Sequence, residues 1–229
     1  DPHIIRIYYI GDDEGQTYFV MEFVEGESLG TLLKREHKVP VGPAAKIIHQ
    51  TTLGLATAHD KGVIHRDIKP ENIGISKNRS GKLQLVLFDF SLCRTSSDNI
   101  TAGTHPYLDP FLSLRKPPRW DLYAERFAAA VTLYEMAVGQ PPIWGDGQTS
   151  PAMLDVEASI ESDVFDPVTR ERFTAFFTKA LRRDYSERFD NAEDMLRAWR
   201  GIFSARQTVH PAEPGSETGL TAIAVTATA

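Results

Sequence analysis

The stretch VIHRDIKPENIGI, residues 63 to 75, places a histidine, an arginine, two acids, a lysine and an asparagine between two short apolar runs. Charged side chains are rarely buried in proteins unless they are paired. A purely structural role would require partners for all of these groups within one turn, whereas a catalytic site needs such groups close together. This stretch is therefore the first candidate for a functional site.

The composition is that of an ordinary soluble globular chain. Its 229 residues are 41% hydrophobic and 24% charged, with a formal net charge of -6. This length and composition are enough for one sizeable domain or two small ones. No basic patch stands out, so we expect no nucleic-acid partner. No apolar run reaches the roughly 18 residues of a membrane span, and the opening DPHIIRIYYIGDD has no signal peptide.

Two single residues add to this picture. Cys93 is the one cysteine of the chain, so no intrachain disulfide can form, and we expect a reducing, cytoplasmic location. Asp1 rather than a methionine opens the chain, which predicts that this is an excerpt from a longer protein.

Periodicity and turn residues predict the elements on either side of the crowded stretch. HIIRIYYI and QTYFVMEFV are expected strands joined at GDDEG, and SLGTLLKR is a short helix that Ser28 caps. Residues 43 to 60 form an amphipathic helix with Pro43 in its first turn. Short strands at GVI and IGI flank the crowded loop, and LQLVLFDF is a further strand.

The second half of the chain is predicted to be irregular at first and then helical. Residues 90 to 120 show no period and are expected to form a long functional loop. Helices follow at AERFAAAVTLYEMAVG, with Gly139 just past its end, at TRERFTAFFTKALRR and at NAEDMLRAWRGIF. Residues 205–229 are rich in Ala, Thr, Pro and Gly and are expected to be a disordered linker. The fold class is α+β and mainly helical.

Several motifs together resemble the eukaryotic-type (Hanks-type) protein kinases, including bacterial serine/threonine kinases. HRDIKPEN resembles their catalytic loop and FDFS their metal-binding motif. MEFVEGESL resembles the hinge, GTHPYLDPF the end of the activation segment, VTLYEMAVGQPP a central helix and DYSERF a C-lobe motif. The resemblance covers residues 1 to 203. It implies an N-lobe remnant and hinge at 1–24, a kinase C-lobe at 25–204 and a tail at 205–229.

The resemblance implies a role for each polar side chain of the crowded loop. Asp67 would accept or orient the proton of the substrate hydroxyl, and Lys69 would lie against the transferring phosphoryl group as a point charge. Asn72 and Asp89 would supply oxygen ligands to Mg²⁺. The implied cofactors are ATP and Mg²⁺. A lysine at this place is typical of serine/threonine specificity.

The hinge resemblance implies a nucleotide site. Met21 corresponds to the gatekeeper, Glu22 and Val24 would offer backbone groups to adenine, and Ser28 lies where a ribose contact is usual. Gly74 takes the place of the branched residue that forms the adenine floor, which would leave this floor short of apolar surface. A leucine at 74 would then tighten nucleotide binding.

The resemblance also implies regulatory residues. Arg66 corresponds to an arginine that pairs with a phosphate on the activation segment, and Thr104 to a threonine that hydrogen-bonds the catalytic Asp and Lys. His65 and Phe90 would stack in the apolar spine of an active kinase. The candidate phosphate acceptors are Thr95, Ser96, Ser97 and Thr101.

Other positions depart from the family pattern. No Gly-rich phosphate loop and no strand lysine for ATP occur in the chain. Ser91 replaces a glycine, and its Cβ would disfavour a positive φ. Phe111 replaces the glutamate that would have paired with Arg188.

A last departure concerns the central helix. Glu125 stands where an aspartate normally holds the catalytic loop, and Asp121, one turn earlier, is the expected compensation.

Three hypotheses follow from these residues. The first is a serine/threonine protein kinase that acts on protein hydroxyls and belongs to a larger protein with other domains. The second is a pseudokinase or interaction module, which the departures favour and the intact catalytic set opposes. The third is a small-molecule phosphotransferase, which Lys69 and GTHPYLDP disfavour. Residues 1 to 229 alone are expected to show no ATP turnover, because the phosphate loop and its lysine are missing. They are also expected to aggregate, because of unpaired strand edges and exposed apolar surface.

Overall fold

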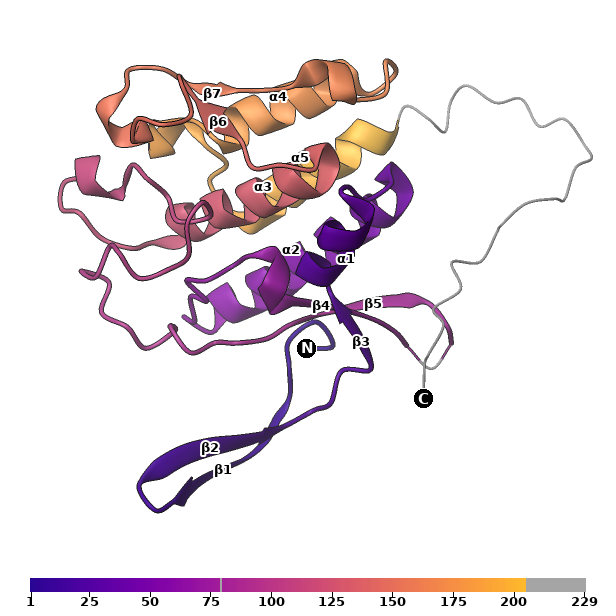
Figure 1. Cartoon of the computed structure of the whole chain (residues 1–229), viewed down its shortest axis with the longest axis vertical. Coiled ribbons are helices and arrows are strands. Elements are labelled where there is room, and N and C mark those ends of the chain that lie inside the picture. Colours follow the sequence, from indigo (N-terminus) through magenta and orange to yellow (C-terminus); the bar gives the residue numbers. More distant parts are fainter. Residues whose placement is uncertain (79, 205–229) are drawn as a thin grey trace, which may run out of the picture.

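The computed structural model describes residues 1–78 and 80–204, which form a mainly helical body with a β-hairpin projecting from it (Figure 1). The tail predicted at 205–229 lies outside the described residues. The α-helices are α1 Leu29–Glu36, α2 Val41–Asp60, α3 Leu122–Val138, α4 Arg170–Ala180 and α5 Ala192–Ser204. The short 3-10 helices are η1 Pro70–Asn72, η2 Leu112–Leu114, η3 Pro151–Met153, η4 Ser162–Val164 and η5 Tyr185–Glu187.

The strands form three small antiparallel sheets. The pair β1 Ile7–Asp13 and β2 Gln16–Met21 makes the hairpin, β3 Gly26–Ser28 joins β4 Ile73–Lys77 and β5 Leu83–Leu87, and β6 Ile143–Trp144 pairs with β7 Ala158–Ser159. No helix in the described ranges is long and apolar enough to cross a membrane.

Helix α3 runs through the centre of the body. Its residues from 124 to 134 are all buried, and most of them are apolar, as expected for a helix in the core. Asp121 caps the start by accepting a hydrogen bond from the N–H of Ala124 at 3.0 Å, and Gly139 ends the helix with φ of 96°. The cap predicted for the first helix is also present, since the Ser28 hydroxyl accepts from the N–H of Thr31.

Aromatic side chains hold α4 and α5 together. Phe173 and Phe176 on α4 both contact Trp199 on α5, with ring centroids 5.3 and 5.0 Å apart. Trp199 is 1% exposed. Truncating such a buried aromatic typically costs about 3–5 kcal/mol, so this cluster anchors the far side of the body from the hairpin (Figure 1).

The three-stranded sheet has one face on the core and one face toward the hairpin side. Ile73, Leu85 and Leu87 point to the core face and are fully buried, whereas Gly74 and Val86, which are paired across the strands, lie on the other face. The open edge of β5 is covered by residues 3–5, because Leu87 exchanges backbone hydrogen bonds of 2.8 Å with His3 and Ile5.

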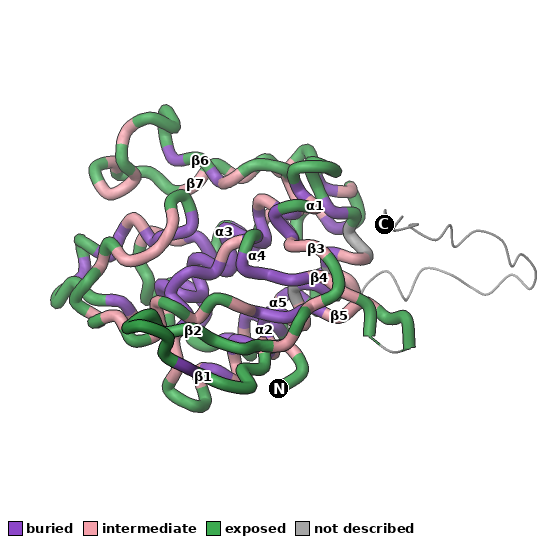
Figure 2. The backbone as a smooth tube through the Cα atoms, turned by 60° about the horizontal axis from the view of Figure 1, so that its bottom comes forward, coloured by how far each residue is buried: buried purple, intermediate pink, exposed green. Residues whose placement is uncertain are grey.

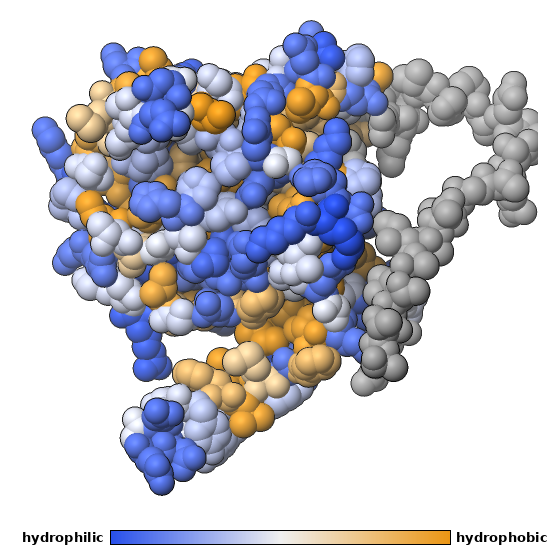
Figure 3. All heavy atoms as spheres, in the orientation of Figure 1, coloured by the Kyte–Doolittle hydropathy of each residue, from blue (hydrophilic) through white to orange (hydrophobic). Residues whose placement is uncertain are grey.

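The hairpin is exposed along both of its sides (Figure 2). Its two-residue turn uses Glu14 and Gly15, with φ of 51° and 82°, the positive values that tight hairpins need. Apolar side chains cover much of its surface (Figure 3). The large apolar residues of the hairpin that are at least 44% exposed are Ile7, Tyr8, Tyr9, Ile10, Tyr18, Phe19, Val20 and Met21.

One predicted strand is absent from the structure, and one observed strand was not predicted. GVI forms no strand, because residues 61 to 64 turn back under α2, with the N–H of Val63 bonded to the carbonyl of Ala58 at 2.9 Å. Strand β3 was not predicted, since three residues without an apolar pattern carry no periodic signal. Residues 90 to 120 are irregular as expected, apart from the single turn η2.

Candidate active site

Asp67 lies at the centre of a compact polar cluster in the loop before β4. Its Oδ2 atom is 2.7 Å from the Lys69 Nζ and 3.1 Å from the Asn72 Nδ2. Asn72 also donates to the Asp67 carbonyl at 2.8 Å, and Lys69 reaches the Thr104 hydroxyl at 2.8 Å. The structure thus brings together the three predicted catalytic residues and Thr104.

The second oxygen of Asp67 is left without a partner. Oδ1 is buried and has no hydrogen bond within the described part of the chain. A buried carboxylate oxygen without a donor is costly, and such groups are common where a ligand supplies the missing contact. Asp67 is therefore held by one oxygen and available through the other.

Glu125 of α3 supports this loop from below, and the expectation that Asp121 would compensate for it was wrong. The buried carboxylate of Glu125 accepts from the N–H of His65 at 2.9 Å and from the N–H of Arg66 at 3.1 Å. Its Oε1 is also 3.3 Å from the His59 Nε2. The longer side chain reaches the loop itself, while Asp121 caps α3 and pairs with Arg115.

His65 and Phe90 stack as the family resemblance implied, with ring centroids 4.4 Å apart. The His65 Nε2 lies 2.9 Å from the carbonyl oxygen of Phe88. Asp89, between the two phenylalanines, adopts φ of 63° and exposes its carboxylate. Ser91 is not among the residues with positive φ, so its Cβ causes no strain in this conformation.

The activation segment is tied to the body at several points. The Arg66 guanidinium donates to the backbone carbonyls of Thr95 and Ser96, the latter at 2.8 Å. Trp120 holds the segment further along, with its N–H 2.7 Å from the Ser97 carbonyl and its Nε1 3.0 Å from the Ala102 carbonyl. A phosphate partner for Arg66 stays a prediction.

Asp109 is the acidic partner of Arg188 in the structure. It is 2% exposed and accepts from Arg188 and from Arg115, both at 2.6 Å. Phe111, at the position of the missing glutamate, is buried against Phe127 and Trp144. The glutamate missing at position 111 is therefore replaced as the partner of Arg188 by a carboxylate two residues earlier in the chain.

A pocket of about 370 Å³ lies between the hairpin side and the three-stranded sheet. Five of the residues predicted to bind the cofactor line it: Met21, Glu22, Val24, Ser28 and Gly74. Asp89 follows directly after Phe88, another residue of the lining. Met21 is 48% exposed and so is not a core residue in this structure.

The space beside Gly74, where the sequence predicted missing apolar surface, is occupied by neighbouring side chains. A Cβ placed on Gly74 would lie 3.3 Å from the Phe88 Cε1 and 3.3 Å from the Val24 Cγ1. These side chains already fill the space above the glycine. Phe88 was not among the predicted site residues, although its position between the end of β5 and Asp89 was a usable signal.

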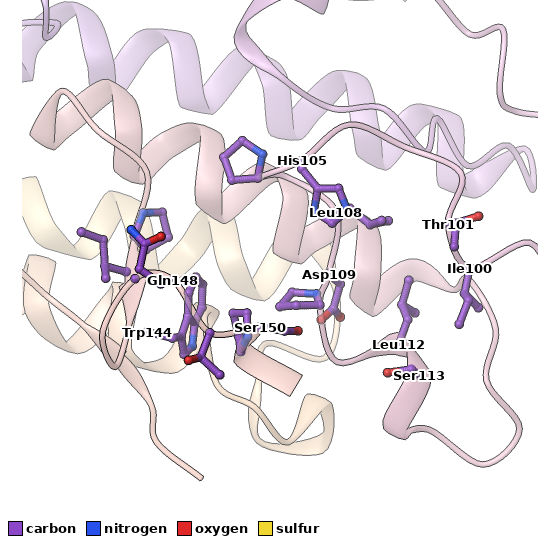
Figure 4. A pocket seen from close by; sticks show the side chains of 17 residues that line it. Ile100, Thr101, His105, Leu108, Asp109, Leu112, Ser113, Trp144, Gln148 and Ser150 are labelled. Atoms are coloured by element: carbon purple, nitrogen blue, oxygen red, sulfur yellow. The ribbon is translucent and has the colours of Figure 1, made fainter. Parts of the chain in front are cut away.

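A second depression, of about 470 Å³, lies beside the end of the activation segment (Figure 4). Ile100, Thr101 and Leu112 line one side of it, and Trp144 and Ser150 the other. Thr101 is exposed, and its hydroxyl donates to the Asn99 side chain at 2.9 Å. A phosphorylation role for Thr101 stays a prediction.

The fold and the site together define a protein kinase domain. A sequence profile of the family described as "Protein kinase domain" matches residues 1–199, so the chain belongs to this family. The probable kinase PglW of Streptomyces coelicolor is 45% identical over 154 residues, which are 65% of this chain and 10% of that protein. The serine/threonine-protein kinase pkn2 of Myxococcus xanthus is 33% identical over 226 residues, or 92% of this chain and 26% of that protein.

A solved structure shows the same fold. The crystal structure of the Mycobacterium tuberculosis PknI kinase domain, as a C20A_R136A double mutant, superposes with a TM-score of 0.66 at 20% identity. The match covers 88% of this chain and 72% of that one. The kinase-like, mainly helical fold that the sequence predicted is confirmed.

Proposed function

We propose that the protein containing this chain transfers the γ-phosphoryl group of Mg-ATP to serine or threonine hydroxyls of other proteins. The proposal rests on the difference between the hydrogen-bond partners of the two carboxylate oxygens of Asp67. One carboxylate oxygen is fixed by Lys69 and Asn72, and the other is buried without a donor. A substrate hydroxyl placed at Oδ1 would supply the missing donor and be oriented for attack.

Lys69 provides the charge that this reaction needs. Its ammonium group contacts both Asp67 and Thr104, so it lies between the catalytic loop and the segment that ends at GTHPYLDP. A positive charge at that place would stabilise negative charge on a phosphoryl group that approaches Asp67. The same contact ties the activation segment to the loop, which favours a protein substrate over a small molecule.

The donor set fits Mg²⁺. The Asn72 amide uses its nitrogen for both contacts with Asp67, which leaves its oxygen as a candidate ligand beside the exposed carboxylate of Asp89. In residues 1–78 and 80–204, no group of three or more His, Cys, Asp or Glu side chains could hold a metal ion. Mg²⁺ typically takes one or two protein ligands and shares the phosphates and waters, and when bound it would neutralise phosphate charge.

The supports of the site favour an enzyme over an interaction module. The sequence raised that alternative because of the departures from the family pattern and the missing part of the small lobe. In the structure Glu125 supports the catalytic loop and Asp109 pairs with Arg188. Several relatives are named serine/threonine-protein kinases, among them PknL of Mycobacterium tuberculosis, 32% identical over 199 residues.

The test is the substitution Asp67→Asn in the full-length protein. Transfer of radiolabelled phosphate to a protein acceptor should fall by about 10³-fold or more, because the proton acceptor and the orienting charge are lost. The melting temperature should change little. Asp163→Asn is the matched control, since that side chain is 94% exposed and distant in sequence from the loop. Unchanged transfer by Asp67→Asn would contradict the proposal.

A further inference from the structure

The pocket face of the three-stranded sheet has an unusual distribution of side-chain volume. Ser28, Gly74 and Val86 are opposite one another across β3, β4 and β5, so they share one face. Phe88 comes two residues after Val86 and therefore points to the same face, diagonal to Gly74. A diagonal neighbour is within reach of an aromatic side chain.

The Phe88 ring uses the space that Gly74 leaves empty. A Cβ at position 74 would come within 3.3 Å of the ring and 3.3 Å of Val24, a tight contact that any larger side chain would turn into overlap. Aromatic side chains commonly cover a glycine on a neighbouring strand in this way. The same arrangement occurs in the hairpin, where the Tyr18 ring covers Gly11.

The backbone of Phe88 is fixed by two residues of the active site. Its N–H donates to the Asn72 carbonyl at 3.2 Å, and its own carbonyl lies 2.9 Å from the His65 Nε2. The side chain is half-buried and lines the 370 Å³ pocket. A ring that is anchored at its backbone and open on one side to a pocket is suited to contact a flat ligand.

We infer that Phe88 forms the apolar floor on which the base of a purine nucleotide rests, and that Gly74 is required to make room for it. This inference rests on the proposed function, because it assumes that the 370 Å³ pocket is the nucleotide site. It assigns Phe88 as a nucleotide-binding residue. It also reverses the earlier expectation that a leucine at position 74 would tighten nucleotide binding. That leucine would overlap the Phe88 ring and weaken binding.

The experiment is a substitution cycle in the full-length protein, with Mg-ADP titration by calorimetry as the readout. Phe88→Ala should weaken binding about tenfold, because the base loses its aromatic contact. Gly74→Leu should also weaken binding. The double variant Phe88→Ala/Gly74→Leu should bind more tightly than either single variant, since the leucine side chain then fills the space that the ring has vacated.

Two control variants distinguish loss of the contact between Phe88 and the base from a general loss of protein stability. Phe88→Leu keeps an apolar side chain in place, so it should fold normally and lose less affinity than Phe88→Ala. Phe203→Ala removes a half-buried ring that contacts Phe173 and Trp199 on the α4–α5 side, so it should lower the melting temperature without changing the Kd.

The outcomes distinguish this inference from the function on which it rests. Binding by Phe88→Ala equal to that of the unsubstituted protein, or a double variant no tighter than Phe88→Ala, would overturn the role of Phe88 alone. Failure of the unsubstituted protein to bind Mg-ADP would overturn the nucleotide site itself, and this inference with it.

Discussion

The catalytic loop and the β1–β2 hairpin differ in how the polarity of their side chains relates to burial. The loop from His65 to Asn72 is crowded with polar groups and yet is mostly buried, because partners from α3 and the activation segment satisfy many of these groups. The Asp67 Oδ1 and the Arg66 Nε are exceptions within the described residues. The hairpin is rich in apolar groups and yet is exposed on both sides.

This difference shows which part of the chain finds its stabilising contacts within the described residues. Buried polar groups are costly unless they find partners, and the body itself provides most of these contacts for the loop. A large exposed apolar surface usually marks a place where another protein segment packs. We therefore expect the body to fold on its own contacts and the hairpin to depend on a contact from outside the described residues.

The largest effect should come from removing the support of the loop. Glu125→Ala leaves the buried N–H groups of His65 and Arg66 without an acceptor, at about 1–3 kcal/mol each. The free energy of unfolding of the body should fall by about 2–5 kcal/mol. Urea unfolding followed by tryptophan fluorescence measures it, because Trp120, Trp144 and Trp199 are all buried in the body.

Asp121→Ala is the matched control for this prediction. It removes a helix N-cap worth about 1 kcal/mol and a partner of Arg115, but it leaves the loop supported. A loss of stability as large as that of Glu125→Ala would show that Asp121 supports the loop after all.

An intermediate effect is expected for the hairpin in residues 1–229 expressed alone. Ile10 and Phe19 are cross-strand partners, 58% and 51% exposed. Replacing both with Thr should reduce self-association in size-exclusion chromatography by at least about half and leave the urea midpoint of the body unchanged, since no core contact is lost. Neither form should turn over Mg-ATP.

Replacing two buried leucines of the three-stranded sheet with threonine provides the comparison. Leu85 and Leu87 are fully buried, so changing both to Thr should unfold the body. If the hairpin variant were destabilised to a similar degree, the hairpin would be part of the core. A monodisperse unsubstituted chain with robust turnover would contradict the dependence on an outside contact.

The smallest effect concerns a partly buried pair near the catalytic loop. Burial raises the pKa of Glu135, although the hydroxyl of Tyr107 donates to its Oε2 at 2.6 Å and opposes that shift. The folded state therefore binds a proton more readily than the unfolded state. This group adds stability on the acidic side, and that contribution is lost as the pH rises through the folded-state pKa.

Glu135→Gln removes this titration and keeps an acceptor for Tyr107. The melting temperature of the variant should equal or exceed that of the unsubstituted protein at pH 7, and the difference should shrink or reverse as the pH falls toward 5. Thermal melts across this range measure it. Parallel pH profiles for the two proteins would show that Glu135 does not titrate differently on folding.

The resemblance of the chain's motifs to a known family predicted the kinase fold, and local signals predicted the order of the helices and the crowded loop around Asp67. These local signals are helical periodicity, capping residues such as Ser28 and Gly139, and a short motif whose spacing is fixed by one loop. Each is encoded within a few neighbouring residues, so it can be recognised without knowledge of distant contacts.

Only the tertiary structure showed which residue makes each supporting contact. Glu125 reaches the loop where Asp121 was expected, Asp109 pairs with Arg188 in place of a missing glutamate, and Phe88 fills the space above Gly74. Asp109 and Phe88 are displaced along the chain from the residues that the pattern names, whereas Glu125 stands at the named position and reaches the loop with a longer side chain. A sequence pattern specifies positions along the chain, whereas packing and hydrogen bonding depend on the positions of atoms in space. A longer side chain, or a residue on a neighbouring strand, can bring an equivalent chemical group to the same point in space.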